Sequence, residues 1–488
     1  GVYTVTNRMV AANSGLIHLK DSGKLQINRL MDGNGNLMGR LGISPADEPA
    51  VVTVDDDAEI QFESGISTMV YICNNHPGLK GVLNWNSSKT LAAIGTLAVG
   101  FSNGEGVLNV TRGTVQGGSY GLRIAQTSSS PVAKATARGI ANVSGGRLLN
   151  ANSWQNTSTV QGLVVGAGVP AVLADPGFMH GTLNVSGGAV TNMQGGAGYF
   201  AVGVGYARGE VMQTGGSIAN AHETYPTVIG AFGGTGEWVV SNGVSSSVCD
   251  VYLGGITTND MPNQPTELYK VARIDAACAT GTLAVVDGTF AAGKAIIAGR
   301  DGAAKIEVGP KGSLTAASAV GVGMQAWGRC IGNHIHHGSG CGVVMWSVWS
   351  ELASNELDHV MQKARDGGGL YGGQAYCRIH DNYVHDMWWP GLYNDEGGRD
   401  SIYYNNRFEN CGWPIHMHAT RRNVVSNNVF KSKGAMHLSF QGSGDCRFVD
   451  NKLYGPASMT NAVVVTKYVP NCAEWARNEV FDLQKDGS

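Results

Sequence analysis

The sequence is short of charge, of proline and of long apolar runs, and each shortage excludes a class of protein. Charged residues are 15% of the 488 residues and the net charge is −3. Because no Lys/Arg block is longer than a pair, no nucleic-acid partner is expected. No stretch approaches the roughly 20 consecutive apolar residues of a membrane helix, so no membrane span is expected either. With 14 prolines and no three-residue glycine period, a collagen is also excluded.

Paired cysteine motifs and a signal segment are missing too. The nine cysteines never form Cys-x-x-Cys, which argues against zinc ribbons and thioredoxin-type sites. Five of them, from Cys330 to Cys446, recur at nearly the coil period described below, so we expect buried small hydrophobes rather than disulfides. Residues 1–10 lack the basic-then-apolar layout of a signal peptide. We expect a secreted, periplasmic or cell-surface protein whose signal peptide has been removed.

Glycine, by contrast, is abundant, with 71 residues, roughly twice the usual share. Between about residues 100 and 320 a unit Gly-x-Φ-x-Val-x-x-Gly recurs, and each copy is typical of a short alternating strand closed by a glycine turn. Apolar runs between copies, at 162–166 and 202–205, are expected to form the next face of the same coil. This half resembles the strand repeats of autotransporter passenger domains. The copies begin at Gly106, Gly139, Gly181 and Gly281, with weaker ones at Gly209 and Gly236.

A second repeat begins near residue 325, where an asparagine is followed by one residue and then by an apolar one. The successive spacings are 22, 27, 24, 22, 23 and 27 residues, which is one turn of a parallel β-helix per copy. Asparagines at one corner of each coil can hydrogen-bond to each other at the ~4.8 Å separation of strands. The sequence therefore predicts an all-β chain, a right-handed parallel β-helix solenoid. The asparagines are Asn333, Asn355, Asn382, Asn406, Asn428, Asn451 and Asn478.

The two repeats divide the chain into three predicted regions. Residues 1–99 form an N-terminal β region and the start of the solenoid, 100–323 the glycine-rich repeats, and 324–488 the coils with the asparagine ladder and the candidate active site. The change at 323–327 has no Pro- or Ser-rich linker. We expect one continuous helix rather than two separate solenoids, because the ends of a parallel helix are open strand edges.

A further column of residues follows from the same register. Because side chains alternate along a strand, one set is expected to stack inside and the next on the outer face. Asp395 and His418 each follow two residues after a member of the outer set, so we expect them to share its surface groove. The inner set is Leu370, Leu392, Ile415 and Met436, and the outer set is Tyr371, Tyr393, His416 and His437.

Residues 325–450 resemble bacterial right-handed parallel β-helix proteins that include glycoside hydrolases acting on fucosylated and xylan-type polysaccharides. Four segments carry the resemblance. They are Asp366-Gly-Gly-Gly-Leu-Tyr371, Gly391-Leu-Tyr-Asn-Asp-Glu396, Cys411-Gly-Trp-Pro-Ile-His-Met-His418 and Arg421-Arg-Asn-Val-Val-Ser-Asn-Asn428. In such proteins an aspartate before paired glycines, and an acidic pair one coil later, supply the candidate catalytic carboxylates. Here a third glycine follows Asp366 and Asn394 precedes the acidic pair.

The resemblance implies a two-carboxylate hydrolase with Asp366 and Asp395 as the pair and Glu396 as a further catalytic candidate. Cleavage of a glycosidic bond needs one protonated and one ionised carboxyl group, and their separation decides between retention and inversion. The spacing of 29 residues leaves that choice open. By strand alternation only one of Asp395 and Glu396 faces the groove unless a turn intervenes. The loop at 367–369 has to curl back for Asp366 to reach Asp395.

The expected substrate is a polysaccharide, including acidic or sulfated ones. Sugar rings stack on flat side chains, and arginines pair with sulfate or carboxylate groups. No signal for an oligomeric state is present. The substrate-binding candidates are Tyr371, Tyr393, His416, His418, Trp388, Trp389, Trp413, Arg421 and Arg422.

Simpler interpretations stand beside these. Asp366 and the acidic pair also fit turn residues, the two histidines fit ordinary surface rungs, and the arginines fit a solvated corner. His416-x-His418 places two imidazoles on one face near Asp395, so a structural zinc or calcium ion is left open, although we expect no cofactor and no metal ligand. The joint occurrence of polar features on successive coils favours a functional site.

Three functions follow. The first is an extracellular glycoside hydrolase. The second is a polysaccharide lyase or epimerase on the same fold, with Arg421 as charge neutraliser and His416 or Tyr393 as base. The third is a non-enzymatic surface adhesin or stalk. Trp, His and acidic residues concentrate between 345 and 440, which a stalk does not require, so an enzyme is favoured.

Overall fold

The computed structural model describes most of the chain. The described residues are 1–6, 8–11, 16–28, 30–31, 37–43, 50–63, 67–74, 80–93, 95–126, 136–151, 162–168, 179–193, 198–256, 279–299, 302–317, 319–321, 328–433, 436–455 and 472–482. Their regular elements are β-strands, with no α-helix among them. No helix in this part of the chain is long and apolar enough to cross a membrane.

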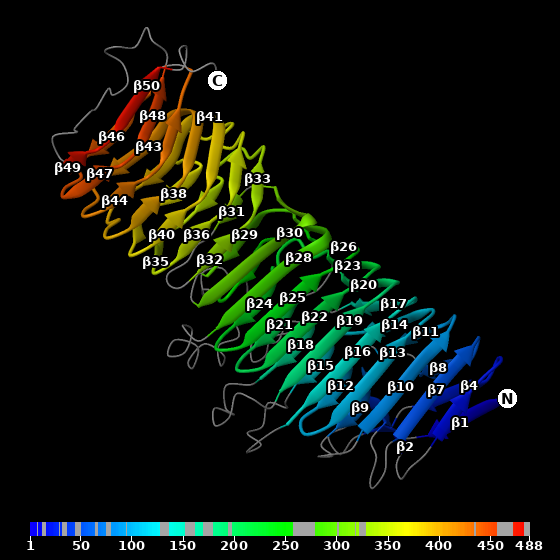
Figure 1. The fold of residues 1–488 in the computed structure, drawn as a ribbon. Coiled ribbons are helices and arrows are strands. Elements are labelled where there is room, and N and C mark those ends of the chain that lie inside the picture. The colour runs from blue at the N-terminus through cyan, green and yellow to red at the C-terminus, as the bar shows by residue number, and fades with distance from the viewer. Residues whose placement is uncertain are drawn as a thin grey trace. The chain divides into compact units, whose positions relative to one another are not determined.

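The chain divides into two compact units, each a parallel β-helix. Unit 1 comprises residues Gly1–Ala292 with Pro310–Leu314, and unit 2 comprises Gly293–Gly309 with Thr315–Ser488. Within each unit the strands of successive coils lie side by side and run in the same direction (Figure 1). The predicted all-β parallel β-helix fold is confirmed, whereas the expected continuity of the two halves stays a prediction.

The coils of unit 1 form three parallel columns of strands. A small sheet of β1 (Val2–Thr6), β4 (Lys24–Asn28) and β8 (Glu59–Phe62) precedes them, and β5 (Leu30–Met31) pairs antiparallel with β6. The first column is β2 (Arg8–Ala11), β6 (Leu37–Ile43), β9 (Ser67–Asn74), β12 (Thr96–Phe101), β15 (Gly121–Gln126), β18 (Gly162–Ala167), β21 (Tyr199–Val204), β24 (Thr227–Ala231) and β27 (Val251–Leu253). The second is β3 (Leu16–Leu19), β7 (Ala50–Asp56), β10 (Lys80–Ser87), β13 (Glu105–Val110), β16 (Arg138–Val143), β19 (His180–Val185), β22 (Arg208–Gln213), β25 (Thr235–Val240) and β28 (Thr280–Ala292). The third is β11 (Thr90–Ala92), β14 (Thr114–Gly117), β17 (Arg147–Asn150), β20 (Ala189–Asn192), β23 (Ser217–Asn220) and β26 (Val244–Ser247).

The glycine repeat predicted for this unit is confirmed as a column in register. Gly106, Gly139, Gly181, Gly209, Gly236 and Gly281 lie opposite one another on successive strands. Glycine is required there because the neighbouring backbone leaves no room for a side chain. A Cβ atom at Gly139 would lie 2.2 Å from the carbonyl oxygen of Val99 and 2.4 Å from the amide nitrogen of Ala125. The repeat therefore marks a corner at which backbone packs on backbone.

Unit 1 also contains two asparagine ladders that the sequence analysis missed. A half-buried ladder uses the fourth residue of the glycine repeat, and its amide bonds are 2.8 Å long from Asn184 to Asn142, Asn142 to Asn109 and Asn109 to Asn84. A buried ladder joins Asn150, Asn192 and Asn220. The first was visible in the repeated Leu-Asn-Val and Ala-Asn-Val triplets.

Unit 2 begins with β29 (Ala295–Ala298), part of β30 (Ala303–Ala316) and β31 (Ala319–Gly321), and its later coils also form three columns. The first is β32 (Arg329–Ile331), β36 (Glu351–Ala353), β40 (Arg378–His380), β42 (Ile402–Tyr404), β44 (Val424–Ser426), β47 (Cys446–Val449) and β49 (Cys472–Ala476). The second is β33 (His334–His336), β37 (Glu356–Asp358), the first half of β41 (Tyr383–Asn394), the first half of β43 (Arg407–His418), β45 (Val429–Lys431), β48 (Lys452–Gly455) and β50 (Glu479–Asp482). The third is β34 (Val343–Val344), β38 (Leu370–Gly372), the second halves of β41 and β43, and β46 (Leu438–Gln441). A separate pair is formed by β35 (Ser347–Val348) and β39 (Gln374–Ala375).

The seven predicted asparagines form one continuous ladder between the first and second columns, as expected. Each of the first six side-chain amides donates to the side-chain oxygen of the next asparagine, at 2.8 to 3.1 Å, and the last donates to the Phe448 carbonyl. The same oxygen also accepts the backbone N–H of the preceding asparagine, for example 3.1 Å from Asn382 to Asn406. The ladder therefore satisfies backbone groups at a buried corner where the sheet hydrogen bonds stop.

Stacked apolar columns fill the core of unit 2. One runs through Leu352, Ile379, Tyr403, Val425 and Phe448, all at most 1% exposed. The side chains of Leu370, Leu392 and Ile415 stack inside as predicted.

The predicted register was wrong at the next coil of this column. Ile415 lies opposite Leu438 and His416 opposite Ser439, so Met436 and His437 are not their partners. A shift of two residues keeps the inside and outside faces of a strand unchanged, and Met436 and Leu438 are both buried. The alternation of side chains alone therefore could not choose between the two registers.

The cysteine prediction is confirmed for the described side chains. Cys330, Cys377, Cys411 and Cys446 are buried free thiols, and Cys341 is a half-buried one. Burial raises the pKa of the thiol of Cys330 to about 12, so this thiol is an inert core group.

Candidate active site

Successive coils of unit 2 bring one aromatic residue each to the outer face of the third column. Tyr371 in β38, Tyr393 in β41 and His416 in β43 lie directly opposite one another. The ring centroids are 5.0 Å apart for the two tyrosines and 4.4 Å apart for Tyr393 and His416. The predicted outer column is thereby confirmed for these three residues.

The column extends at both ends into what we call the aromatic strip. Trp346 packs edge-on against Tyr371 at 5.9 Å, and Trp413 packs against His416 at 5.1 Å. From Trp413 the contacts continue to Trp389, whose ring is nearly parallel at 6.0 Å, and from Trp389 to Trp388 at 4.9 Å. The strip comprises Trp346, Tyr371, Tyr393, His416, Trp413, Trp389 and Trp388.

Trp346 is the member that the sequence analysis missed. It follows β34, whose two residues continue the column one coil before Tyr371. A strand of two residues is too short to show an alternating pattern. Only the position of Trp346, two residues after Val344, could have indicated its place in the strip. Its side chain is 45% exposed and covers Gly373, where a Cβ atom would meet the indole at 2.9 Å.

Asp395 lies beside the strip, at the end of β41. Its side chain accepts hydrogen bonds from the Tyr371 hydroxyl at 3.0 Å and pairs with Nδ1 of His418 at 2.8 Å. Burial acts to raise the pKa of Asp395, but the hydrogen bonds from His418, from the backbone N–H of Glu396 and from Tyr371 outweigh burial and hold the pKa below its ordinary value of 3.8. Asp395 is therefore an ionised, 8% exposed carboxylate at neutral pH.

The residue before Asp395 anchors it to the core. The side-chain amide of Asn394 donates to the Tyr403 hydroxyl at 2.7 Å, and its oxygen accepts the backbone N–H of Gln374 at 3.1 Å. Asn394 is fully buried, and a Cβ atom at Gly398 would lie 1.9 Å from its oxygen. The glycine pair after Glu396 thus lets the turn close tightly over Asn394 and fixes where Asp395 points.

Glu396 differs from Asp395 in its exposure. A turn begins at Glu396, and its side chain is exposed, whereas that of Asp395 is buried. The turn that the sequence left open is thus present, and Asp395 is the member of the acidic pair that contacts Tyr371 and His418.

The two histidines of the His416-x-His418 motif have different environments. His416 is 6% exposed, and its buried Nδ1 has no hydrogen-bond partner among the described residues. Burial, with a smaller contribution from His418, lowers the pKa of His416 to about 4. His418 is half-buried and is held through Nδ1 by Asp395, which leaves Nε2 on the opposite edge of its ring.

Asp366 lies on an exposed loop and affects the same tyrosines through its charge. Burial raises the pKa of Tyr393 to about 12, and the carboxylates of Asp395 and Asp366 both add to this rise. Burial and the same two carboxylates raise the pKa of Tyr371 as well. Both phenols are thus protonated hydrogen-bond donors near neutral pH. The two predicted carboxylates act electrostatically on one pair of tyrosines.

The triple glycine after Asp366 has a structural reason. Gly367 has a φ of 134°, and a Cβ atom at Gly368 would lie 2.9 Å from the Pro390 carbonyl oxygen and 3.2 Å from Cβ of Tyr393. The chain therefore turns at Gly367 and passes closely along the coil that carries Tyr393. A side chain at either position would push Asp366 away from the tyrosines.

The two predicted arginines lie at another corner of the coil. Arg421 forms backbone bridges with Arg399 and Gly444, and its side chain is exposed. Arg422 makes a two-pronged ion pair with Asp400 at 2.7 Å for each bond. A similar two-pronged pair joins Arg477 and Asp450 at a different corner of later coils, so such pairs also occur away from the aromatic strip.

The site has no group with metal-ligand spacing among the residues that the structure describes. His416, His418 and Asp395 do not bring three ligand atoms together, and the groups that do lie on earlier coils of unit 2.

Comparison with known proteins agrees with the fold. Residues 318–470 match the family model of the right-handed β-helix region, and this segment contains the aromatic strip and Asp395. No curated protein and no solved structure matches the chain. The right-handed β-helix is a fold compatible with enzymes that act on polysaccharides.

Proposed function

We propose that the protein is a secreted or cell-surface glycoside hydrolase that acts on a polysaccharide bound along the aromatic strip. One observation carries the proposal: the buried carboxylate of Asp395, held by Tyr371 and His418, lies beside a row of partly exposed indoles, with Asp366 as a second carboxylate that acts on the same tyrosines. The resemblance of the Asp366 and Asp395 segments to β-helix glycoside hydrolases supports the same conclusion. Flat indole faces suit sugar rings, and paired carboxyl groups suit glycosidic cleavage.

The roles follow from the environment of each group. Asp395 is kept ionised by His418 and Tyr371, so it acts as the nucleophile or as the base that activates water. Asp366, exposed on its loop, is the carboxyl group left to protonate the leaving oxygen. Tyr371 and Tyr393 remain protonated and donate hydrogen bonds to Asp395 and to sugar hydroxyl groups. His416 is neutral near pH 7, and its ring packs between Tyr393 and Trp413 in the strip.

A product screen tests the proposal. The purified chain is incubated with sulfated fucans, xylans and pectins, and new reducing ends are measured beside the ultraviolet absorbance of unsaturated sugars. Reducing ends without that absorbance indicate hydrolysis, and the anomer first released shows whether configuration is retained or inverted. Binding without turnover would instead support a surface adhesin.

The first prediction concerns the loss of activity at low pH. An ionised Asp395 is required, and its pKa is held below 3.8, so kcat/KM is expected to fall only below about pH 4. The stability of the fold is expected to depend on pH in the same direction. Because the pKa of Asp395 is lower in the folded chain than in the unfolded chain, its carboxylate stabilises the fold above the unfolded pKa. This stabilisation is lost as the pH falls through the folded pKa. Circular dichroism at each pH separates loss of activity from unfolding. A limb well above pH 4 would contradict the role given to Asp395.

The second expected outcome concerns substrate binding. Trp413→Ala removes the indole between Trp389 and His416, so KM is expected to rise about fivefold with a smaller change in kcat, since stacking contributes about 1 kcal/mol. Trp349→Ala is the matched control, because Trp349 is another exposed indole and stacks on Tyr376, outside the strip. Equal effects of the two substitutions on KM would mean that the strip does not bind substrate.

The lyase or epimerase alternative also gains one observation. His418 is held by Asp395 through Nδ1, and this arrangement orients Nε2 as a base that could remove a proton from a uronate. His418 fits the role of base better than His416 or Tyr393 does, because His416 is buried and the pKa of Tyr393 is raised to about 12. Unsaturated products in the screen would favour this alternative over hydrolysis.

A further inference from the structure

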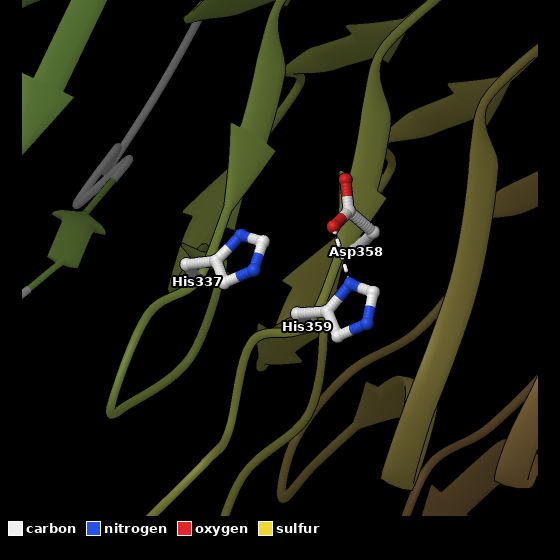
Figure 2. A group of neighbouring side chains, drawn as sticks. All are labelled: His337, Asp358 and His359. Atoms are coloured by element: carbon white, nitrogen blue, oxygen red, sulfur yellow. Dashed lines mark hydrogen bonds and ion pairs between the residues drawn. The ribbon is translucent and has the colours of Figure 1, made fainter.

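Four histidines and a carboxylate gather on two successive coils of unit 2, apart from the candidate active site. His334 and His336 lie on β33 and His337 follows it; one coil later Asp358 ends β37 and His359 follows it. Nδ1 of His359 lies 2.6 Å from one Asp358 oxygen, and Nε2 of His334 lies 2.6 Å from the other. Figure 2 shows the rings of His337 and His359 on the same side of the coil as Asp358.

Coil register brings these side chains together. His336 lies opposite Asp358, which places His337 directly above His359 at the corner that follows. Their rings are stacked at 4.8 Å with an angle of 9° between their planes. The same corner is occupied by Asp386 and Asn410 on the next two coils, and all four residues have a φ between 47° and 55°. The backbone therefore fixes the two imidazoles one coil apart.

The donor atoms fit a borderline transition metal rather than a hard cation. His337, Asp358 and His359 each offer one ligand atom, and the three atoms lie within 4.8 Å of one another. Zinc bound by imidazole and carboxylate has bonds of about 2.0–2.2 Å, so its ligand atoms lie roughly 3.3 Å apart. The exposed His337 and half-buried His359 can close that gap by rotating their side chains. Calcium and magnesium prefer oxygen ligands, which two of these three residues lack.

Two neighbouring features strengthen the donor set. A second group, His334, Glu356 and Asp358, also has ligand atoms within 4.8 Å and shares the Asp358 carboxylate. His336 lies with its Nδ1 3.0 Å from Nδ1 of His337. A fourth ligand for a tetrahedral ion is therefore available from either side of the triad.

We propose that His337, Asp358 and His359 form a zinc site that joins two successive coils of unit 2. The ion links residues that follow β33 and β37, where the sheet hydrogen bonds of the second column end. It acts as a clamp between coils, and it does not rest on the function proposed for the aromatic strip.

The site is tested by zinc binding to the full chain after treatment with a chelator. Zinc chloride alone is titrated by calorimetry at neutral pH, and cobalt is added in parallel, because tetrahedral cobalt absorbs strongly in the visible range. We expect one ion per chain, with micromolar or tighter affinity, and a rise in melting temperature on zinc addition. His337→Asn and His359→Asn are each expected to weaken binding by at least about tenfold.

Asparagine is the substitution of choice because Asn410 occupies the same corner with a φ of 51°. Asp358→Asn should weaken binding as well. The matched control is His380→Asn, since His380 also lies between two carboxylates, Glu351 and Asp381, but outside the triad. If the His337 and His359 variants bind zinc as tightly as the unsubstituted chain, or if the His380 variant loses binding equally, the inference is overturned. Variants that retain the circular dichroism spectrum of the unsubstituted chain exclude misfolding as the cause.

Discussion

Asp395→Asn is expected to lower kcat/KM by at least about 10³-fold while leaving the fold intact. The substitution keeps the shape of the side chain and removes the charge that His418 and Tyr371 hold in place. Without an ionised carboxylate there is no nucleophile or base, whatever the sugar. The measurement is the initial rate on the polysaccharide that the product screen identifies.

The effect on stability is expected to be small but not zero. The sequence pattern predicts Asp395 in an outer surface groove, whereas in the structure Asp395 is only 8% exposed and is hydrogen-bonded on both oxygens. An amide in its place keeps a hydrogen-bonding oxygen but loses the charge-assisted bond with His418. We expect the melting temperature to fall by a few degrees. A fall large enough to unfold the chain at assay temperature would instead support a structural turn aspartate.

Two substitutions separate the role of Asp395 from a general effect of charge. Asp450→Asn removes a carboxylate that pairs with Arg477 at an exposed corner, and its rate should equal that of the unsubstituted chain. Glu396→Gln should retain most activity, because Glu396 is exposed and the hydrogen bonds to Tyr371 and His418 are made by Asp395. Full activity in Asp395→Asn together with a large loss in Glu396→Gln would transfer the catalytic role to Glu396.

The parts of the site that sequence could predict are those fixed by coil register. Tyr371, Tyr393 and His416 stack because apolar residues before them fall on the inside face, and period-two alternation then dictates the outside face. The predicted position of His437 was wrong because a shift of two residues preserves that alternation, and Ser439 lies opposite His416 instead. Register was thus predictable where the spacing matched and ambiguous where a coil differed in length.

Other features depend on contacts between coils that no single motif encodes. The imidazoles of His337 and His359 meet only because one coil places them 22 residues apart on the same corner. The lowered pKa of Asp395 depends on His418, one coil later, and on Tyr371, one coil earlier. The residues that act together on a solenoid surface come from successive coils, whereas a sequence motif lies within one continuous stretch of the chain.

Asn406→Ala is expected to destabilise unit 2 by about 2–5 kcal/mol. The Asn406 oxygen accepts two bonds from Asn382, one from the backbone N–H at 3.1 Å and one from the side chain at 2.8 Å. Its amide donates to the Ile379 carbonyl at 2.9 Å and to Asn428 at 3.0 Å. Alanine removes four bonds at a corner where Asn406 is 1% exposed, and no water replaces them easily.

The control uses the neighbouring exposed amide. Asn427→Gly deletes a side chain that donates to Asn405 at 2.5 Å on the surface, at a φ of 55° that glycine adopts without strain. Its free energy of unfolding should change by no more than about 0.5 kcal/mol in denaturant titrations followed by circular dichroism. Because both variants lose one amide within one coil of the ladder, their difference isolates the buried network. Equal stability of the two would mean that neighbouring groups close over the deleted amide, and that the asparagines set the spacing of the coils without stabilising them.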